Sequence, residues 1–163
     1  MGFGFGKAAI VAAALALAAG TAWAHDAPQP ATPAGKAAGA RHQNFKQIGG
    51  AFKKAFDESK RRSPDAKVIG GSAQKLVVLS RQMTTWFPAG SGPGSGANTH
   101  AKAEVWNDPQ GFAAAVQKFQ AETVKLQQVA ATGDGGAAKA QVAAVGGACK
   151  NCHDKFRVPE KKK

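Results

Sequence analysis

The chain has 163 residues, a length that predicts one domain or at most two small ones. It contains 20 glycines, 8 prolines and no tyrosine, and aromatic residues make up only 7% of it, so a core of its own side chains would be thin. The formal net charge of +12 makes the protein strongly basic, and two cysteines exclude a scaffold stapled by several disulfides.

Residues 1–24 are predicted to be a signal peptide that is cleaved on export. Lys7 supplies the positive start, residues 8–20 are apolar, and residues 22–24 form an Ala-Trp-Ala cleavage site. The apolar run is shorter than the roughly 20 residues that cross a bilayer, which favours cleavage over a retained anchor, and no later segment is expected to insert into a membrane. In a bacterium the product would reside in the periplasm, and export removes nucleic acid as the partner of a basic protein.

Residues 25–40 are rich in proline, alanine and glycine and lack an apolar period, so they are predicted to form a flexible arm. The first helix is expected from Arg41. Apolar residues recur there at spacings of three and four, which places them on one face of a helix: Phe45, Ile48, Phe52 and Phe56. A basic run at residues 60–62 ends this helix.

The second helix is expected to start at residues 63–65, where serine, proline and aspartate provide the usual features of a helix N-terminus. Its apolar stripe runs from Ile69 to Phe87, and Pro88 ends it. Residues 89–98 are rich in glycine and serine and are predicted to be a flexible loop that continues to about Val105.

Two further helices complete the chain. The third is expected to start at residues 107–109, with an apolar stripe from Phe112 to Ala130, and the fourth follows a glycine-rich turn at residues 133–136. No segment alternates with the period of a strand. The sequence therefore predicts an all-α fold, an antiparallel four-helix bundle of up-down-up-down topology over residues 41–158, followed by a basic tail at residues 159–163.

Cys149, Cys152 and His153 form a C-x-x-C-H motif, the attachment signature of c-type haem. In a helix these positions share one face, because residues three and four apart are neighbours. Two thiols can then bond to one edge of the haem while the imidazole ligates the iron. The motif predicts one covalent haem c at the fourth helix, and the haem would supply the apolar body that the core lacks.

Two other kinds of site use a pair of cysteines. A thioredoxin-like dithiol needs a β-α-β setting in which the pair opens a helix after a strand, whereas this pair lies near the end of an all-helical chain. A zinc site needs a fourth ligand, and the sequence offers no second C-x-x-C pair and no H-x-x-x-H pair. The haem interpretation is therefore favoured over both.

Because the motif lies in the last predicted helix, the sequence resembles the cytochrome c′ family of class II c-type cytochromes, which are four-helix bundles. The resemblance extends from about Arg41 to Arg157. Besides the motif, it is carried by an arginine with an apolar residue four positions later, an E-V-W-N-D segment, two phenylalanines of the third helix and a final F-R pair: Arg41, Phe45, residues 104–108, Phe112, Phe119, Phe156 and Arg157.

The resemblance implies a role for each residue of the motif and for one neighbour. Cys149 and Cys152 would hold the haem, and His153 would be its only strong axial ligand. Arg157 would lie near the proximal histidine, although a basic residue at a helix end is also common without any such role.

Three polar residues are implied on the side of the haem that carries its propionates: Arg41, His42 and Thr99. Arg41 would form a charge-assisted pair with one propionate. Phe45 would cover the open side of the iron, whereas the apolar pattern alone describes it only as a core aromatic. Further apolar residues would line the haem pocket or the core: Phe52, Phe87, Phe112, Phe119 and Val145.

The resemblance implies a five-coordinate haem protein, not an enzyme, that binds nitric oxide and carbon monoxide and/or exchanges electrons in the periplasm. One alternative is a six-coordinate, low-spin electron carrier like the class II relatives that carry methionine at the position of Phe45; beyond the signal peptide this chain has only Met83. A less favoured alternative is a peroxidase-like enzyme, which would need a distal acid or base, and His42 is the only nearby candidate.

Two kinds of protein partner are expected. The resemblance implies a homodimer paired through the first two helices, where small residues permit close approach: Gly49, Gly50, Gly70, Gly71 and Ser72. Cations cluster around the motif at Lys150, Lys155, Arg157 and residues 161–163, and they predict an unidentified redox partner that is anionic.

Overall fold

The computed structural model describes Met1 and residues 28–159, so the predicted signal peptide and basic tail lie outside the described residues apart from one residue each. Four long helices form the fold: α1 (Pro33–Ser59), α2 (Ala66–Gln82), α4 (Pro109–Ala131) and α5 (Gly135–Phe156). A 3-10 helix, η1 (Met83–Trp86), and a single turn, α3 (Glu104–Asn107), lie in the connection between α2 and α4. The predicted all-α four-helix bundle is confirmed.

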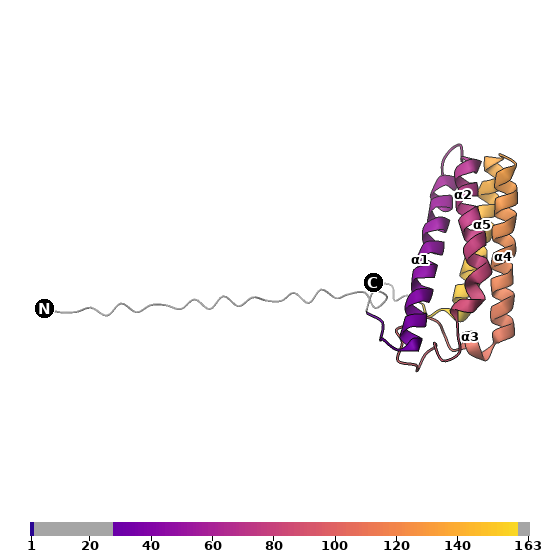
Figure 1. The fold of residues 1–163 in the computed structure, drawn as a ribbon. Coiled ribbons are helices and arrows are strands. Elements are labelled where there is room, and N and C mark those ends of the chain that lie inside the picture. Colours follow the sequence, from indigo (N-terminus) through magenta and orange to yellow (C-terminus); the bar gives the residue numbers. More distant parts are fainter. Residues whose placement is uncertain (2–27, 160–163) are drawn as a thin grey trace.

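The long helices run in alternating directions (Figure 1). The turns from α1 to α2 and from α4 to α5 lie at one end of the bundle, and the longer connection with η1 and α3 lies at the other end. Helix α2 packs against α1 and α4, α5 packs against α4, and sparser contacts between α1 and α5 close the ring. The topology is therefore up-down-up-down, as expected.

The largest fully buried apolar side chains come from α2, α4 and α5: Ile69, Leu76, Val116, Leu126, Val142 and Val145. Helix α1 adds Ile48 and two alanines and packs the half-buried Phe45 and Phe52 against this core. The predicted stripe of α1 is wrong at Phe56, which is 41% exposed. Its ring stacks on Phe52 with centroids 5.9 Å apart and lies 4.0 Å from Lys60 Nζ. A stacking contact and a cation–π contact therefore stabilise the ring at the surface.

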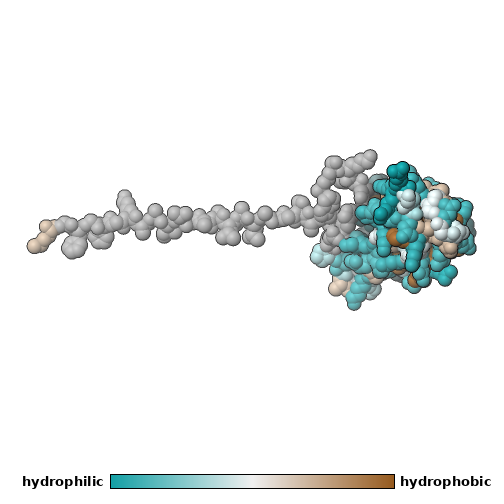
Figure 2. All heavy atoms as spheres, turned by 90° about the horizontal axis from the view of Figure 1, so that it is seen from above, coloured by the Kyte–Doolittle hydropathy of each residue, from teal (hydrophilic) through white to brown (hydrophobic). Residues whose placement is uncertain are grey.

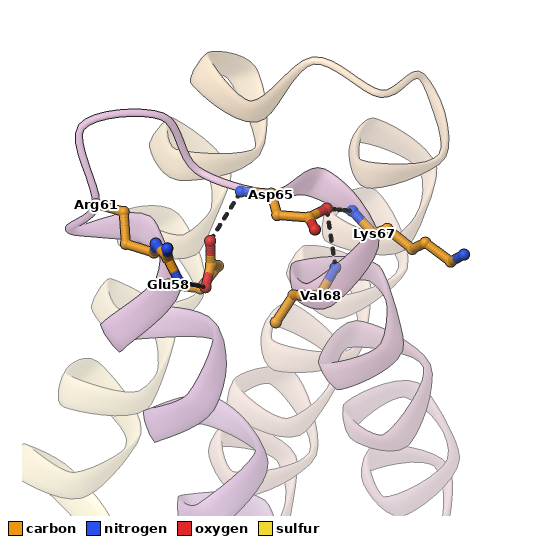
Figure 3. A network of polar contacts seen from close by, with 5 residues as sticks. All are labelled: Glu58, Arg61, Asp65, Lys67 and Val68. Atoms are coloured by element: carbon orange, nitrogen blue, oxygen red, sulfur yellow. Dashed lines mark hydrogen bonds and ion pairs between the residues drawn. The ribbon is translucent and has the colours of Figure 1, made fainter.

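Polar side chains fix the helix starts, since each caps otherwise unpaired backbone N–H groups. The capping residues of the four long helices are Thr32, Asp65, Asp108 and Asp134. The second helix thus starts after Asp65, a little later than the sequence suggested. Figure 3 shows how this start is tied to the end of α1: Glu58 Oε1 accepts a hydrogen bond of 2.9 Å from the Asp65 N–H, while Glu58 Oε2 lies 3.5 Å from Arg61 Nη1.

The flexible arm expected at residues 25–40 is wrong for its second half, because α1 already begins at Pro33. Thr32 accepts a hydrogen bond of 3.1 Å from the Gly35 N–H, and a proline at the first helical position is compatible with the helix. The alanines that follow have the highest helix propensity. Gly35 and Ala38 are buried, so these first turns belong to the domain.

The loop expected to be flexible at residues 89–98 is also packed in part. Ser91 is 1% exposed, and a side chain at Gly92 would meet the Trp106 ring at 2.7 Å. The Trp106 indole N–H donates to the Pro88 carbonyl at 3.2 Å, which holds the start of this loop against α3. The glycine- and serine-rich composition overestimated the flexibility of this loop. Tertiary contacts hold it, and such contacts leave no periodic pattern in the sequence.

The surface is largely hydrophilic where the bundle is seen from the end that carries the two short turns (Figure 2). Among the described helices, none is both long enough and apolar enough to cross a membrane.

Candidate functional site

The two cysteines and the histidine of the motif lie in one uninterrupted stretch of α5, near its C-terminal end. Cys149 and Cys152 are half-buried and pack against the hydrophobic core, whereas His153 is exposed. The two cysteines form no disulfide with each other. The structure therefore places the thiols toward the interior of the bundle, while the imidazole remains accessible beside them.

Burial raises the pKa of the Cys149 thiol to about 11, with the neighbouring Cys152 as a smaller cause. Burial likewise raises the pKa of Cys152. A catalytic dithiol works through a thiolate whose pKa is lowered, so this environment disfavours the thioredoxin-like alternative. Within residues 28–159, no three His, Cys, Asp or Glu side chains converge to hold a metal ion, and the zinc alternative finds no ligand set there.

Arg41 of α1 is almost completely buried, at 4% exposure. Its guanidinium donates four hydrogen bonds: from Nη1 to the Trp86 carbonyl at 3.2 Å and to Ser91 Oγ at 3.0 Å, and from Nη2 to the Ser91 carbonyl at 3.0 Å and to Thr99 Oγ1 at 2.8 Å. The guanidinium carbon also lies 4.8 Å from the centroid of the Phe87 ring. Arg41 and Thr99, both predicted from the sequence, are therefore brought together.

All the partners of Arg41 in these contacts are neutral, and none of the ion pairs among the described residues involves it. Burial lowers the pKa of its guanidinium, which reflects the cost of holding an uncompensated cation inside the protein. The next residue in the chain, His42, has a buried Nε2 atom without a hydrogen-bond partner. A buried cation without a counter-charge and an unsatisfied imidazole nitrogen fit an anionic group such as a haem propionate.

Phe45 lies one helical turn after Arg41 and begins a chain of edge-to-face aromatic contacts. Its ring centroid is 5.4 Å from that of Trp86 and 6.1 Å from that of Phe87. Phe87 contacts Phe112 at 4.8 Å, and Phe112 contacts Phe156 at 5.3 Å. The chain connects α1 to the end of α5, so Phe45 belongs to the aromatic cluster next to the motif-bearing helix.

Arg157 immediately follows α5, and its N–H donates to the His153 carbonyl at 3.0 Å. It also pairs with Ala101 in an isolated antiparallel bridge: Lys102 N donates to the Phe156 carbonyl at 2.9 Å, and Val158 N to the His100 carbonyl at 2.8 Å. The segment after Thr99 is thus attached to the residues after His153. The structure links the Arg41 side and the Arg157 side of the site through one short stretch of chain.

Sequence reasoning missed Ser91 and Trp86, which supply three of the four acceptors of Arg41. Two of these three acceptors are backbone carbonyls, which leave no signal in side-chain patterns. The seryl hydroxyl lies in a glycine- and serine-rich stretch that resembles a linker.

A four-helix bundle whose last helix carries two half-buried thiols and a histidine at the C-x-x-C-H spacing defines the class of c-type haem bundles. The family model described as cytochrome c′ matches residues 36–157. A cytochrome c′ from Rubrivivax gelatinosus is 40% identical over 118 residues, which are 72% of this chain and 90% of that protein. A cytochrome c′ from Alcaligenes xylosoxydans xylosoxydans is 37% identical over 93 residues, 57% of this chain and 69% of that protein.

Solved structures agree with these sequence matches. The crystal structure of cytochrome c′ from Rubrivivax gelatinosus superposes with a TM-score of 0.67 at 38% identity and covers 76% of this chain and 96% of that one. A nitric oxide complex of a variant cytochrome c prime from Alcaligenes xylosoxidans superposes with a TM-score of 0.69 at 29% identity, covering 78% and 97%. The chain belongs to the cytochrome c′ family, and its cofactor is haem c.

Proposed function

We propose that this chain is an exported, five-coordinate haem protein in which Cys149 and Cys152 hold the haem covalently and His153 is the axial ligand. The observation that carries the proposal is the placement of both thiols against the core on the helix face next to an exposed histidine. When bound, haem c supplies an open coordination position for diatomic gases and a one-electron iron couple. The residues of this chain bind it, orient it and control access to it.

Arg41 holds one propionate, and His42 and Thr99 complete that end of the site. The support for this assignment is the buried guanidinium without a counter-charge and the unsatisfied His42 Nε2 atom. A propionate would supply the counter-charge that Arg41 lacks and a partner for His42 Nε2, and hydrogen bonds to charged groups are stronger than those between neutral groups. The Arg157 backbone N–H bonds the His153 carbonyl, and we assign its side chain to the proximal side, where its positive charge would act on the imidazole.

Nitric oxide and carbon monoxide are the ligands that we propose for the open side. Phe45 offers neither a lone pair to the iron nor a hydrogen-bond donor to a bound ligand. Bound dioxygen depends on a distal donor far more than these two gases do. Nitric oxide is also the ligand in the structure from Alcaligenes xylosoxidans that resembles this chain.

Two observations weigh against the alternatives. Phe45, which stands at the position of the methionine in six-coordinate carriers, has no lone pair for the iron, and Met83 lies instead in η1, within the hydrophobic core cluster. His42, which a peroxidase-like enzyme would need above the iron, neighbours Arg41 at the end assigned to the propionates. The family relationship likewise favours electron transfer and gas binding over catalysis.

A homodimer paired through α1 and α2 is the assembly that we propose. A groove between these helices is lined by small residues, Gly50, Ala51, Gly71 and Ser72, and by Lys46, Lys54 and Lys75. A side chain at Gly49, Gly50 or Gly71 would meet nothing within 4 Å, so these glycines leave space on the outside instead of making room for a haem inside. Gly70 differs, because a side chain there would contact Ala130 of α4 at 3.4 Å.

The lysines of this groove would face each other across a two-fold axis, and salt screens such repulsion. Sedimentation at low and at moderate ionic strength is therefore expected to show a dimer that becomes tighter as salt is added. A monomer at micromolar concentration in both conditions would refute the pairing.

The haem assignment is tested by its attachment and its absorption spectrum. After extraction with acidified acetone, the red colour is expected to stay with the polypeptide, and a Cys149→Ala, Cys152→Ala double variant is expected to release it. The ferric spectrum is expected to be high-spin, and the ferrous spectrum is expected to change when nitric oxide is added. Release of the haem from the wild-type chain would overturn covalent attachment, and a low-spin ferric spectrum would overturn five-coordination.

A further inference from the structure

Residues 28–35 form a contact that lies outside the stretch matched by the family, which begins at residue 36. The side-chain amide of Gln29 pairs with the backbone of Asn98. Gln29 Nε2 donates to the Asn98 carbonyl at 2.8 Å, and the Asn98 N–H donates to Gln29 Oε1 at 3.0 Å. Asn98 Nδ2 donates a third hydrogen bond of 3.0 Å to the Pro28 carbonyl. A side chain thus pairs with the loop in the way a neighbouring strand would.

The same segment packs closely on the first turns of α1. A side chain at Gly35 would meet the Pro30 carbonyl oxygen at 2.0 Å, and one at Gly39 would meet Gln29 Cγ at 3.3 Å. Gly35 is therefore required by this close approach and not by the helix, in which glycine is unfavourable. The contact holds residues 28–30 over α1 and directs Gln29 toward the loop.

Asn98 is adjacent to Thr99, the acceptor that the Arg41 guanidinium reaches at 2.8 Å. Thr99 Oγ1 also accepts a hydrogen bond of 3.1 Å from the Ala101 N–H, and Ala101 forms the bridge to Arg157. The loop is consequently fastened on both sides of Thr99, by Gln29 before it and by the end of α5 after it. The second attachment does not reach Asn98, whose backbone and side chain are held by Gln29 and Pro28.

We propose that Gln29 is a positioning residue for the haem: the clasp formed by residues 28–35 holds Thr99 against Arg41 and so sets the environment of the propionate that Arg41 binds. The inference rests on the proposed role of Arg41. If the clasp opens, Thr99 moves away and water reaches the guanidinium. Because charges interact less strongly in a better hydrated environment, Arg41 then neutralises the propionate less well. The clasp would act on the haem without touching it.

The test uses two variants of the haem-loaded protein that open the clasp by different means. Gln29→Ala removes the two hydrogen bonds to the Asn98 backbone, and Gly35→Ala displaces residues 28–30 by collision with the Pro30 carbonyl. The matched controls are Gln128→Ala, an exposed glutamine in α4, and Gly147→Ala, an exposed glycine of α5 with open space around its missing side chain. Both controls are expected to behave like the wild type.

Three readouts follow the effect from the clasp to the haem. We expect the amide of Ala101 to exchange with deuterium about fivefold faster in both clasp variants, since each loses the support of weak, exposed hydrogen bonds. We expect labelling of Arg41 by phenylglyoxal to accelerate by a similar factor, and the reduction potential to fall because the propionate charge is less well neutralised. The variants must retain the helical circular dichroism of the wild type.

Faster exchange at the Asn98 amide alone, with Ala101 and Arg41 unchanged, would overturn the proposal, because Gln29 would then hold only its direct neighbour. An unchanged reduction potential despite faster labelling of Arg41 would overturn it as well. Arg41→Lys separates this failure from failure of the proposed function. If Arg41→Lys also leaves the potential unchanged, Arg41 does not act on the propionate, whereas a shift in Arg41→Lys alone contradicts only the role of Gln29.

Discussion

The guanidinium of Arg41 donates a hydrogen bond of 2.8 Å to Thr99 Oγ1, and 58 positions separate the two residues in the sequence. This contact joins the first long helix to the loop that precedes α3. The same loop is bound to the backbone that follows His153 through the Ala101–Arg157 bridge. A segment with the composition of a linker is therefore a structural part of the candidate haem site.

Arg41→Leu is expected to destabilise the protein by about 1–3 kcal/mol, because the buried acceptors of Trp86, Ser91 and Thr99 lose their hydrogen-bond donor. This loss outweighs the gain from removing a buried charge. The measurement is the midpoint of urea unfolding, with the slope of the transition as a check on the denatured state. Arg62→Leu changes an exposed arginine and is expected to stay within about 0.5 kcal/mol of the wild type. Equal effects of the two substitutions would contradict the structural role of Arg41.

Phe45→Ala is expected to accelerate carbon monoxide binding to the ferrous protein by about tenfold or more. A ligand must displace the ring from its edge-to-face contacts with Trp86 and Phe87, and each such pair contributes roughly 0.5–1.5 kcal/mol. Flash photolysis measures the rate. Phe56→Ala, which removes an exposed ring from the same helix, serves as the control and should not change it. If both variants bind carbon monoxide at the wild-type rate, Phe45 is not the gate.

The ion pair between Asp108 and Lys155 ties the start of α4 to the end of α5, at 2.6 Å. The hydrogen bond from Lys155 and a second one from the Gly111 N–H hold the pKa of the Asp108 carboxyl below its ordinary value of 3.8. A carboxyl with a lowered folded-state pKa stabilises the protein above the unfolded value, and this contribution is lost as the pH falls through the folded value. Acid unfolding should therefore begin at higher pH in Lys155→Met than in the wild type.

The double-mutant cycle provides the control for this pair. Asp108→Asn keeps an oxygen that can cap α4 through the Gly111 N–H but removes the titrating charge. In the Asp108→Asn background, Lys155→Met should no longer move the acid transition. A shift of the same size in both backgrounds would show that Lys155 acts through another group.

Reduction by an anionic reductant should slow as ionic strength rises, because the formal net charge of the chain is +12 and salt screens its attraction for anions. Ion pairs in the structure reduce the contribution that the cations around the motif make to this attraction. Lys150 lies 2.5 Å from Asp154, and Lys155 is paired with Asp108, so these two cations are partly neutralised. Stopped-flow reduction over a range of salt concentrations measures the slope, with an uncharged reductant as control. A flat dependence would rule out steering by charge.

The sequence by itself determined the helices of the bundle and the chemistry of α5. Apolar residues at helical spacing predicted the four long helices, because a helix that buries one face must repeat apolar residues along it. The C-x-x-C-H motif was equally readable, since its three residues are neighbours along one helix and need no distant partner. Both signals are local: the four helices are confirmed, and α5 carries Cys149, Cys152 and His153 on one continuous helix.

Only the tertiary structure decided which distant residues meet. Nothing in the sequence placed Ser91 and the Trp86 carbonyl around Arg41, or paired Gln29 with Asn98, because such contacts depend on the path of a loop without any period. The predicted arm failed for the same reason: a composition typical of linkers became helix at Pro33 once Thr32 capped it and the buried Ala38 packed into the domain. The prediction for Phe56 was wrong for a related reason: its spacing fits the apolar stripe, but which positions of a stripe become buried depends on the packing of the other helices, and its ring stays 41% exposed.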